Sequence, residues 1–167
     1  MPEKKTIERA KKDKREGKSA STQAGEFVRE EFEHIREGKH GARSPEQAIA
    51  IGLSEARRAG VDLPPPKKGK ASEKTIKQAE RDRKAANKGT SRKVSAKRSR
   101  ATRKALKREG HSAASKKAVA RHARKAARKR SAGERSAAAK KAARTKGASE
   151  RSAAAKKAAR TRANRSR

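Results

Sequence analysis

The feature that most constrains this chain is a block of positive charge at its carboxyl end. Residues 88–167 contain 30 lysines and arginines and three acidic residues, so they carry a net charge of about +27. The block has no proline, phenylalanine, tyrosine or tryptophan. Because like charges repel and little here is apolar, such a segment cannot form a core of its own. It requires a polyanion, and nucleic acids are the most abundant intracellular polyanions.

The other 87 residues have a more balanced charge, with 22 basic and 15 acidic residues. Large apolar side chains are few, and Phe27 and Phe32 are the two aromatic ones. Across the whole chain, 42% of the residues are charged. This composition predicts an all-α protein, with a small helical hairpin and an extended, partly disordered helical tail rich in Ala, Lys and Arg.

Apolar spacing and capping signals place the hairpin at residues 22–63. Its first helix, 22–37, carries Ala24, Val28, Phe32 and Ile35 on one stripe, with Phe27 beside them. Its second helix, 45–59, begins with a Ser-Pro-Glu-Gln start signal and presents Ile49, Leu53 and Ala56. Because such a core is marginal alone, we expect support from a dimer or from flanking helices.

Composition shifts divide the rest of the chain. We expect a charged N-terminal helix within 1–21, the hairpin domain at 22–63, a Pro/Lys linker at 64–71, a charged helix at 72–87 and the basic repeat tail at 88–167.

Two internal similarities stand out. Residues 134–145 recur without change at 150–161, which indicates a modular tail that docks repeatedly. Residues 5–13 resemble residues 74–82, because Lys, Thr, Ile, Ala and Asp coincide in register, and this suggests an internal duplication.

Two resemblances follow from these residues. The pairs Glu31-Phe32 and Arg43-Ser44, the tripeptide Glu37-Gly38-Lys39 and above all residues 47–60 (QAIAIGLSEARRAG) resemble a small bacterial domain family of unknown function, sometimes labelled plasmid stabilisation or DNA-binding. The tail resembles those of linker histones and bacterial histone-like proteins. The first resemblance implies a bacterial source and supplies no catalytic residue. The second implies a histone-like mode of binding for the tail.

We therefore expect non-specific nucleic-acid binding through phosphate contacts, with DNA compaction or bridging as the result. The repeat offers no Asn or Gln to read base edges, so sequence preference should be weak. The basic residues expected to contact phosphates are Lys97, Arg98, Arg100, Arg103, Lys104, Lys116, Lys117, Arg121, Arg124, Lys125, Arg128, Lys129, Arg130, Lys140, Lys141, Arg144, Lys156, Lys157 and Arg160.

The sequence indicates no enzyme, no cofactor and no metal site. There is no cysteine, and the four histidines show no metal-ligand spacing. Gly17-Lys18-Ser19 echoes the end of a phosphate-binding loop but lacks its first glycine and a preceding strand. Three acids of the first hairpin helix, Glu30, Glu31 and Glu33, are expected on its solvated face.

The expected partner is DNA, and the alternative is RNA or the ribosome, since charge alone does not separate the two polymers. No membrane partner is expected, because the repeat has only alanine opposite its charges. Residues 22–63 are a candidate homodimer surface. The absence of a signal peptide or an apolar span predicts a cytoplasmic, nucleoid location.

Overall fold

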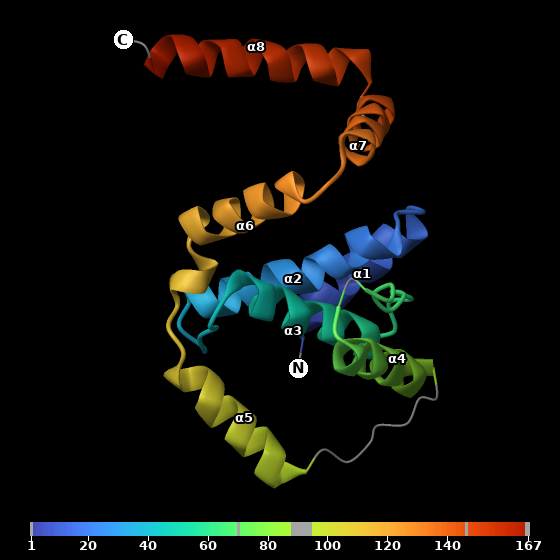
Figure 1. Cartoon of the computed structure of the whole chain (residues 1–167), viewed down its shortest axis with the longest axis vertical. Helices are drawn as coiled ribbons and strands as arrows, with labels where there is room; N and C mark the ends of the chain where they lie inside the picture. The colour runs from blue at the N-terminus through green and yellow to red at the C-terminus, as the bar shows by residue number, and fades with distance from the viewer. Residues whose placement is uncertain (1, 70, 88–94, 146, 166–167) are drawn as a thin grey trace. The chain divides into compact units, whose positions relative to one another are not determined.

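The computed structural model describes residues 2–69, 71–87, 95–145 and 147–165. Within these ranges the structure is helical and contains no β-strand, which confirms the all-α prediction (Figure 1). Residues 88–94, at the start of the predicted basic tail, lie outside the described residues. The elements are α1 (Lys4–Arg15), α2 (Ala20–Arg36), α3 (Pro45–Arg58), α4 (Glu73–Asn87), α5 (Ala96–Arg108), the 3-10 helix η1 (Ser112–Ala114), α6 (Lys116–Arg128), α7 (Ala132–Thr145) and α8 (Ala148–Arg165).

The chain divides into two compact units, residues 1–122 and 123–167. The first unit contains the predicted hairpin together with α1, α4, α5, η1 and the first half of α6. The second contains the end of α6 and the two repeat helices, α7 and α8. The structural division therefore falls inside the segment that the charge pattern marks as one tail.

The hairpin of α2 and α3 forms the centre of the first unit (Figure 1). Phe27 and Ile35 are completely buried, and Phe32 is 8% exposed. The helices approach so closely at Gly52 that a Cβ there would lie 2.8 Å from the Cα of Val28. Because a side chain at this position would collide with backbone, glycine is required for the two helices to meet.

Capping residues fix where α3 begins. Ser44 accepts a hydrogen bond from the backbone N–H of Gln47 at 3.2 Å, and the Gln47 side chain accepts one from the N–H of Arg43 at 2.8 Å. Pro45 occupies the first turn, where its missing N–H costs nothing. These reciprocal bonds satisfy amides that the helix itself leaves unpaired, as the sequence predicts.

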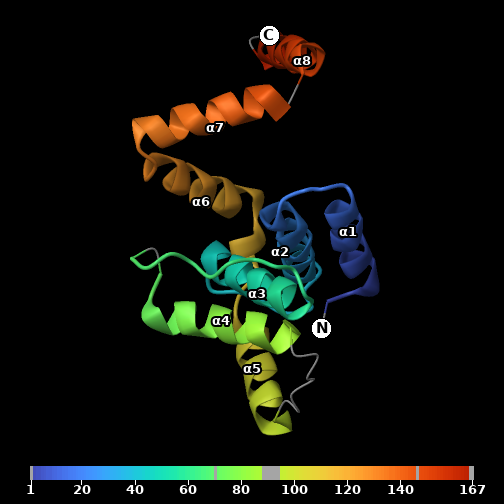
Figure 2. The same cartoon turned by 90° about the vertical axis from the view of Figure 1, so that its right-hand side faces the viewer.

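Flanking helices cover the hairpin on both sides: α1 packs on α2, and α4 packs on α3 (Figure 2). The two segments that resemble each other in sequence bury the same alanine and aspartate positions, although Thr6 is buried and Thr75 is exposed. Ala10 and Ala79 are buried to the same degree, as are Asp13 and Asp82. This shared burial supports the suggested duplication, and it shows that flanking helices complete the small core.

Part of the basic tail also packs on the hairpin. Ala113 and Ala114, in η1, are buried in one cluster with Phe32, and Val119 of α6 packs against the same cluster. The Arg36 guanidinium lies 5.9 Å from the centre of the Phe32 ring and donates from Nε to the carbonyl of Ala114 at 2.9 Å. Ala113, Ala114 and Val119 are therefore part of the core of the first unit, which the charge pattern does not reveal.

The loop between α2 and α3 is hydrogen-bonded to the end of α5 and to the residues that follow it. The N–H of Gly41 donates to the carbonyl of Leu106 at 2.9 Å, and that of Ala42 donates to Gly110 at 3.1 Å. Arg43 pairs with Glu109 at 3.1 Å. These contacts join residues more than 60 positions apart along the chain.

The prediction of a partly disordered tail is wrong for the described residues, which form α5, α6, α7 and α8. Alanine has the highest helix propensity, and its runs outweigh the repulsion between like charges on which the prediction relied. Gly133 lies in the first turn of α7, whereas Gly110 and Gly147 lie between helices.

The close approach at Gly52 gives a test of the fold. We expect Gly52→Ala to destabilise the protein by about 1–3 kcal/mol, because the added methyl group meets backbone atoms of α2. The control is Gly25→Ala, also within a hairpin helix, where a Cβ meets nothing within 4 Å. That change should stabilise by about 0.5–1 kcal/mol. Urea denaturation measures both, and equal effects would contradict the close packing of α2 and α3.

Candidate nucleic-acid interface and a carboxylate–histidine cluster

The structure places all nineteen predicted phosphate-binding residues on exposed surface. Five lie on α5, six on α6, three on α7 and three on α8, and Lys129 and Arg130 directly follow α6. Exposure is what a phosphate contact requires, because a buried lysine or arginine would first have to leave its internal partners.

Helix α6 arranges its charges in one line. Lys117, Arg121, Arg124 and Arg128 recur at steps of four, three and four residues, which puts them on one face of the helix. At 1.5 Å per residue this basic stripe is about 16 Å long. Val119, which packs on the hairpin core, lies on the opposite face.

Another contact orients α6 on the same side as Val119. His122 Nδ1 donates to Oε1 of Glu46, on α3, at 2.9 Å. This hydrogen bond is the main reason that the pKa of Glu46 is lowered to about 2. With this face of α6 held on the core, Lys117 and Arg121, the two stripe residues of the first unit, lie on the side of the helix away from it. The stripe can be found in the sequence, but only the contacts of Val119 and His122 show which face of α6 is turned toward the core.

The repeat helices α7 and α8 distribute their charges differently. In α7, Lys140, Lys141 and Arg144 share one sector, while Arg135 lies on the opposite side, and the identical residues of α8 repeat this pattern. Apart from Ala143, which is half-buried, the side chains described from Ala132 to Arg144 and from Ala148 to Asn164 are exposed. Both helices therefore offer basic side chains on two sides.

The two copies differ at their amino ends. Ser131 Oγ accepts from the N–H of Glu134 at 3.1 Å, while Glu134 Oε2 accepts from the N–H of Ser131 at 2.8 Å. This capping box starts α7. Sixteen residues later the position of Ser131 is taken by Gly147, which has no side chain to cap α8.

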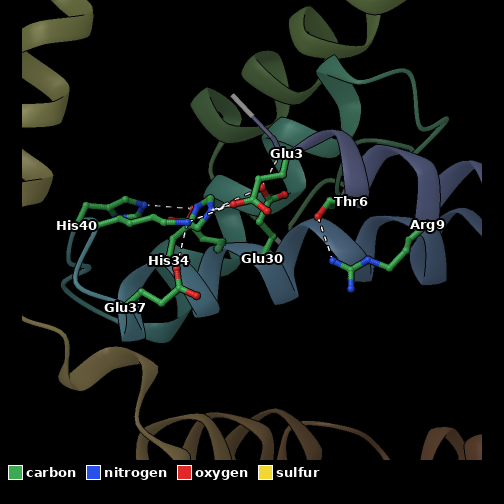
Figure 3. Close-up of polar contacts among 9 residues, drawn as sticks. Glu3, Thr6, Arg9, Glu30, His34, Glu37 and His40 are labelled. Atoms are coloured by element: carbon green, nitrogen blue, oxygen red, sulfur yellow. Dashed lines mark hydrogen bonds and ion pairs between the residues drawn. The ribbon is translucent and has the colours of Figure 1, made fainter.

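A second group of polar side chains lies where α2 ends. Glu30 and Glu31 are 3% and 2% exposed, so the expectation that they line a solvated face is wrong, although Glu33 is exposed as expected. His34, one turn further, and His40, in the following loop, approach them, as Figure 3 shows for Glu30, His34 and His40. We call Glu3, Glu30, Glu31, His34 and His40 the carboxylate–histidine cluster.

The cluster contains contacts just beyond hydrogen-bond range. Glu31 Oε2 lies 3.6 Å from His40 Nε2, and Glu30 Oε1 lies 3.6 Å from His34 Nε2. The ring centres of the two histidines are 6.2 Å apart, in an edge-to-face arrangement. Glu3, from the chain before α1, accepts a hydrogen bond from His34 Nε2 at 3.2 Å (Figure 3).

Burial, the largest cause, and the negative charge of Glu55 on α3 together raise the pKa of the Glu31 carboxyl to about 7. Hydrogen bonds from His34 and Lys39 lower the pKa of Glu3. The whole cluster could not be predicted from the sequence, because residues 3, 31 and 40 have no regular spacing. Its visible part is the trio Glu30, Glu31 and His34, which lie within one turn of the same helix.

Residues 3–68 match the model of a protein family described as a family of unknown function (DUF6496). The matched region, about two fifths of the chain, includes α1, α2, α3 and the start of the linker, and it contains the whole carboxylate–histidine cluster. No curated protein and no solved structure matches the chain. In the part of the chain that the structure describes, no helix has the length and apolar character to cross a bilayer.

The raised pKa of Glu31 predicts how stability depends on pH. The folded-state pKa, about 7, exceeds the usual value of 4.5, so this group favours the folded state below about pH 4.5 and loses that contribution as pH rises through 7. Glu31→Gln removes the ionisation. In buffer containing EDTA, we expect this variant to be more stable than the wild type at pH 8 by about 1–3 kcal/mol. The difference should vanish below pH 5, and urea denaturation at both pH values measures it.

Proposed function

We propose that this protein binds nucleic acid, with DNA as its main partner, through the phosphate backbone and with little sequence preference. The observation that carries the proposal is the basic stripe of α6, four cations on one face of the helix, of which Lys117 and Arg121 belong to the part of α6 that is held on the core of the first unit. A helix fixed in this way presents its charges without the entropy cost of ordering a free peptide.

The remaining basic helices carry further positive charge. The net charge of about +27 on residues 88–167 would match the phosphates of about 14 base pairs of duplex. Binding would release the ions condensed on the DNA, and this release makes affinity fall steeply with added salt. Because α7 and α8 offer charge on two sides, they suit phosphates on both edges of a groove or on two duplexes. Compaction or bridging of DNA in a nucleoid is the expected consequence.

The proposed role is a binding function without catalysis or a cofactor. Weak sequence preference is expected because the repeat contains no Asn or Gln that could read base edges. Arginine reads guanine only when its position along the DNA is fixed, and none of the described repeat side chains is buried. RNA offers the same phosphates, so duplex RNA is the necessary comparison in each binding experiment.

Neutralising the stripe tests the proposal. We expect the variant with Lys117, Arg121, Arg124 and Arg128 all changed to Gln to lose three to four units of salt slope, roughly 0.9 for each phosphate contact removed. The measurement is fluorescence anisotropy of a labelled 20-base-pair duplex over a series of salt concentrations, with an RNA duplex in parallel.

The matched control changes Lys4, Lys11, Lys14 and Arg15 to Gln. These four exposed cations of α1 carry the same total charge as the stripe but lie on another helix. We expect this control to retain most of the wild-type slope. If both variants lose affinity equally, binding depends on net charge and not on the stripe. Stronger binding of the RNA duplex than of the DNA duplex would favour the alternative partner.

Deleting residues 131–167 tests the contribution of the repeat helices. This segment contains twelve basic and two acidic residues. We expect the truncated protein to lose several units of salt slope, far more than the single unit lost with one Lys→Ala change. Because the buried clusters lie within residues 1–122, its thermal midpoint should equal that of the full chain. A lowered midpoint with unchanged DNA binding would contradict this division of roles.

A further inference from the structure

We propose that Glu31, His34 and His40 bind one divalent transition-metal ion, with zinc as the natural probe. One carboxylate oxygen and one ring nitrogen from each histidine lie within 4.8 Å of one another. A second group, Glu3, Glu30 and His34, shares His34 with the first. The first group is the more buried, so we assign the ion to it.

The spacing of these atoms suits a metal centre better than a hydrogen bond. Around a tetrahedral zinc ion with bonds of about 2.0–2.1 Å, neighbouring ligand atoms lie about 3.4 Å apart. Glu31 Oε2 and His40 Nε2 are separated by 3.6 Å, which is close to that edge length and beyond the distance of a good hydrogen bond. A small inward movement of two side chains would complete the coordination.

Two buried carboxylate oxygens would be stabilised by a bound cation. Among the described residues, Glu31 Oε1 and Glu30 Oε2 have no hydrogen-bond partner, although both side chains are at least 97% buried. A buried carboxylate oxygen without a partner costs free energy that a protein ordinarily avoids. A bound dication would compensate the charge of Glu31 directly and that of Glu30 at longer range.

The histidine rings are held as metal-binding rings are held. His40 Nδ1 donates to the carbonyl of Gly41 at 3.2 Å, which leaves the lone pair on Nε2, the atom that faces Glu31. A backbone carbonyl on the second ring nitrogen is the usual way in which proteins fix a ligating imidazole. In His34 it is Nε2 that donates to the carboxylate of Glu3, so the lone pair that an ion would take lies on Nδ1.

The local fold brings His40 back to the helix. Gly38 ends α2 with a φ of 77°, a conformation that glycine adopts without strain, and the N–H of Lys39 donates to the carbonyl of His34 at 3.0 Å. This turn reverses the chain, so a residue six positions after His34 returns beside it. A metal ion here would tie the loop to α2, and the same loop is bound by Leu106 and Gly110.

The ligand set selects the class of metal. Two imidazoles and one carboxylate suit zinc, cobalt, nickel or ferrous iron, whereas calcium and magnesium prefer oxygen ligands alone. Three protein ligands leave one tetrahedral position for water or another small ligand.

The experiment is calorimetric titration of the EDTA-stripped full-length protein with zinc chloride at pH 7.5 and moderate salt. We expect one ion per chain and an upward shift of the thermal midpoint as zinc is added. Glu31→Gln and His40→Ala should each weaken binding at least tenfold. Cobalt supplies an independent readout, since its visible absorption reports whether the site is tetrahedral.

The control is His111→Ala, which removes an exposed histidine outside the cluster and should bind zinc like the wild type. Circular dichroism shows whether each variant retains its helices, and Glu31→Gln preserves side-chain shape in case His40→Ala does not fold. The proposal is overturned if zinc does not bind, or if a folded Glu31→Gln binds zinc as tightly as the wild type. It is also overturned if His111→Ala alone weakens binding.

Discussion

Contact between α2 and α3 at Gly52 is the interaction on which the rest of this structure depends. This contact allows Phe27 and Ile35 to be completely buried in a chain that has very few large apolar side chains. Each such side chain contributes about 1.5–3 kcal/mol when buried, so a core this small cannot lose one. Helices α1 and α4, η1 and Val119 all pack on the framework that this contact creates.

Helices α1 and α4, which contain the two similar segments, satisfy their buried aspartates with different partners. Asp13 accepts a hydrogen bond from Lys18 at 2.7 Å, whereas Asp82 accepts one from Ser54 at 2.6 Å. The buried alanine and aspartate are the same in both helices, but the group that satisfies the carboxylate differs. A duplicated helix can thus retain its packing positions while the side chain opposite its polar residue changes.

Local signals predicted the four helices that precede the basic tail, and long-range contacts account for what could not be predicted. Ser44 and Gly38 mark helix ends through bonds to residues a few positions away, so the bounds of α2 and α3 follow from the sequence to within two residues. The burial of Glu31 depends on α3 and on the loop that contains His40, and no periodicity records such contacts. The packing of Ala114 on Phe32, 82 positions away, was hidden for the same reason.

The unequal starts of α7 and α8 have a consequence for how the tail would meet a polymer. The helix that begins with reciprocal bonds at Ser131 and Glu134 resists fraying, and the copy that follows Gly147 opens more easily at its first turn. Two identical twelve-residue segments would therefore lose different amounts of conformational entropy on binding a nucleic acid. The two copies have the same sequence, but the first turn of α7 is held more firmly than the first turn of α8.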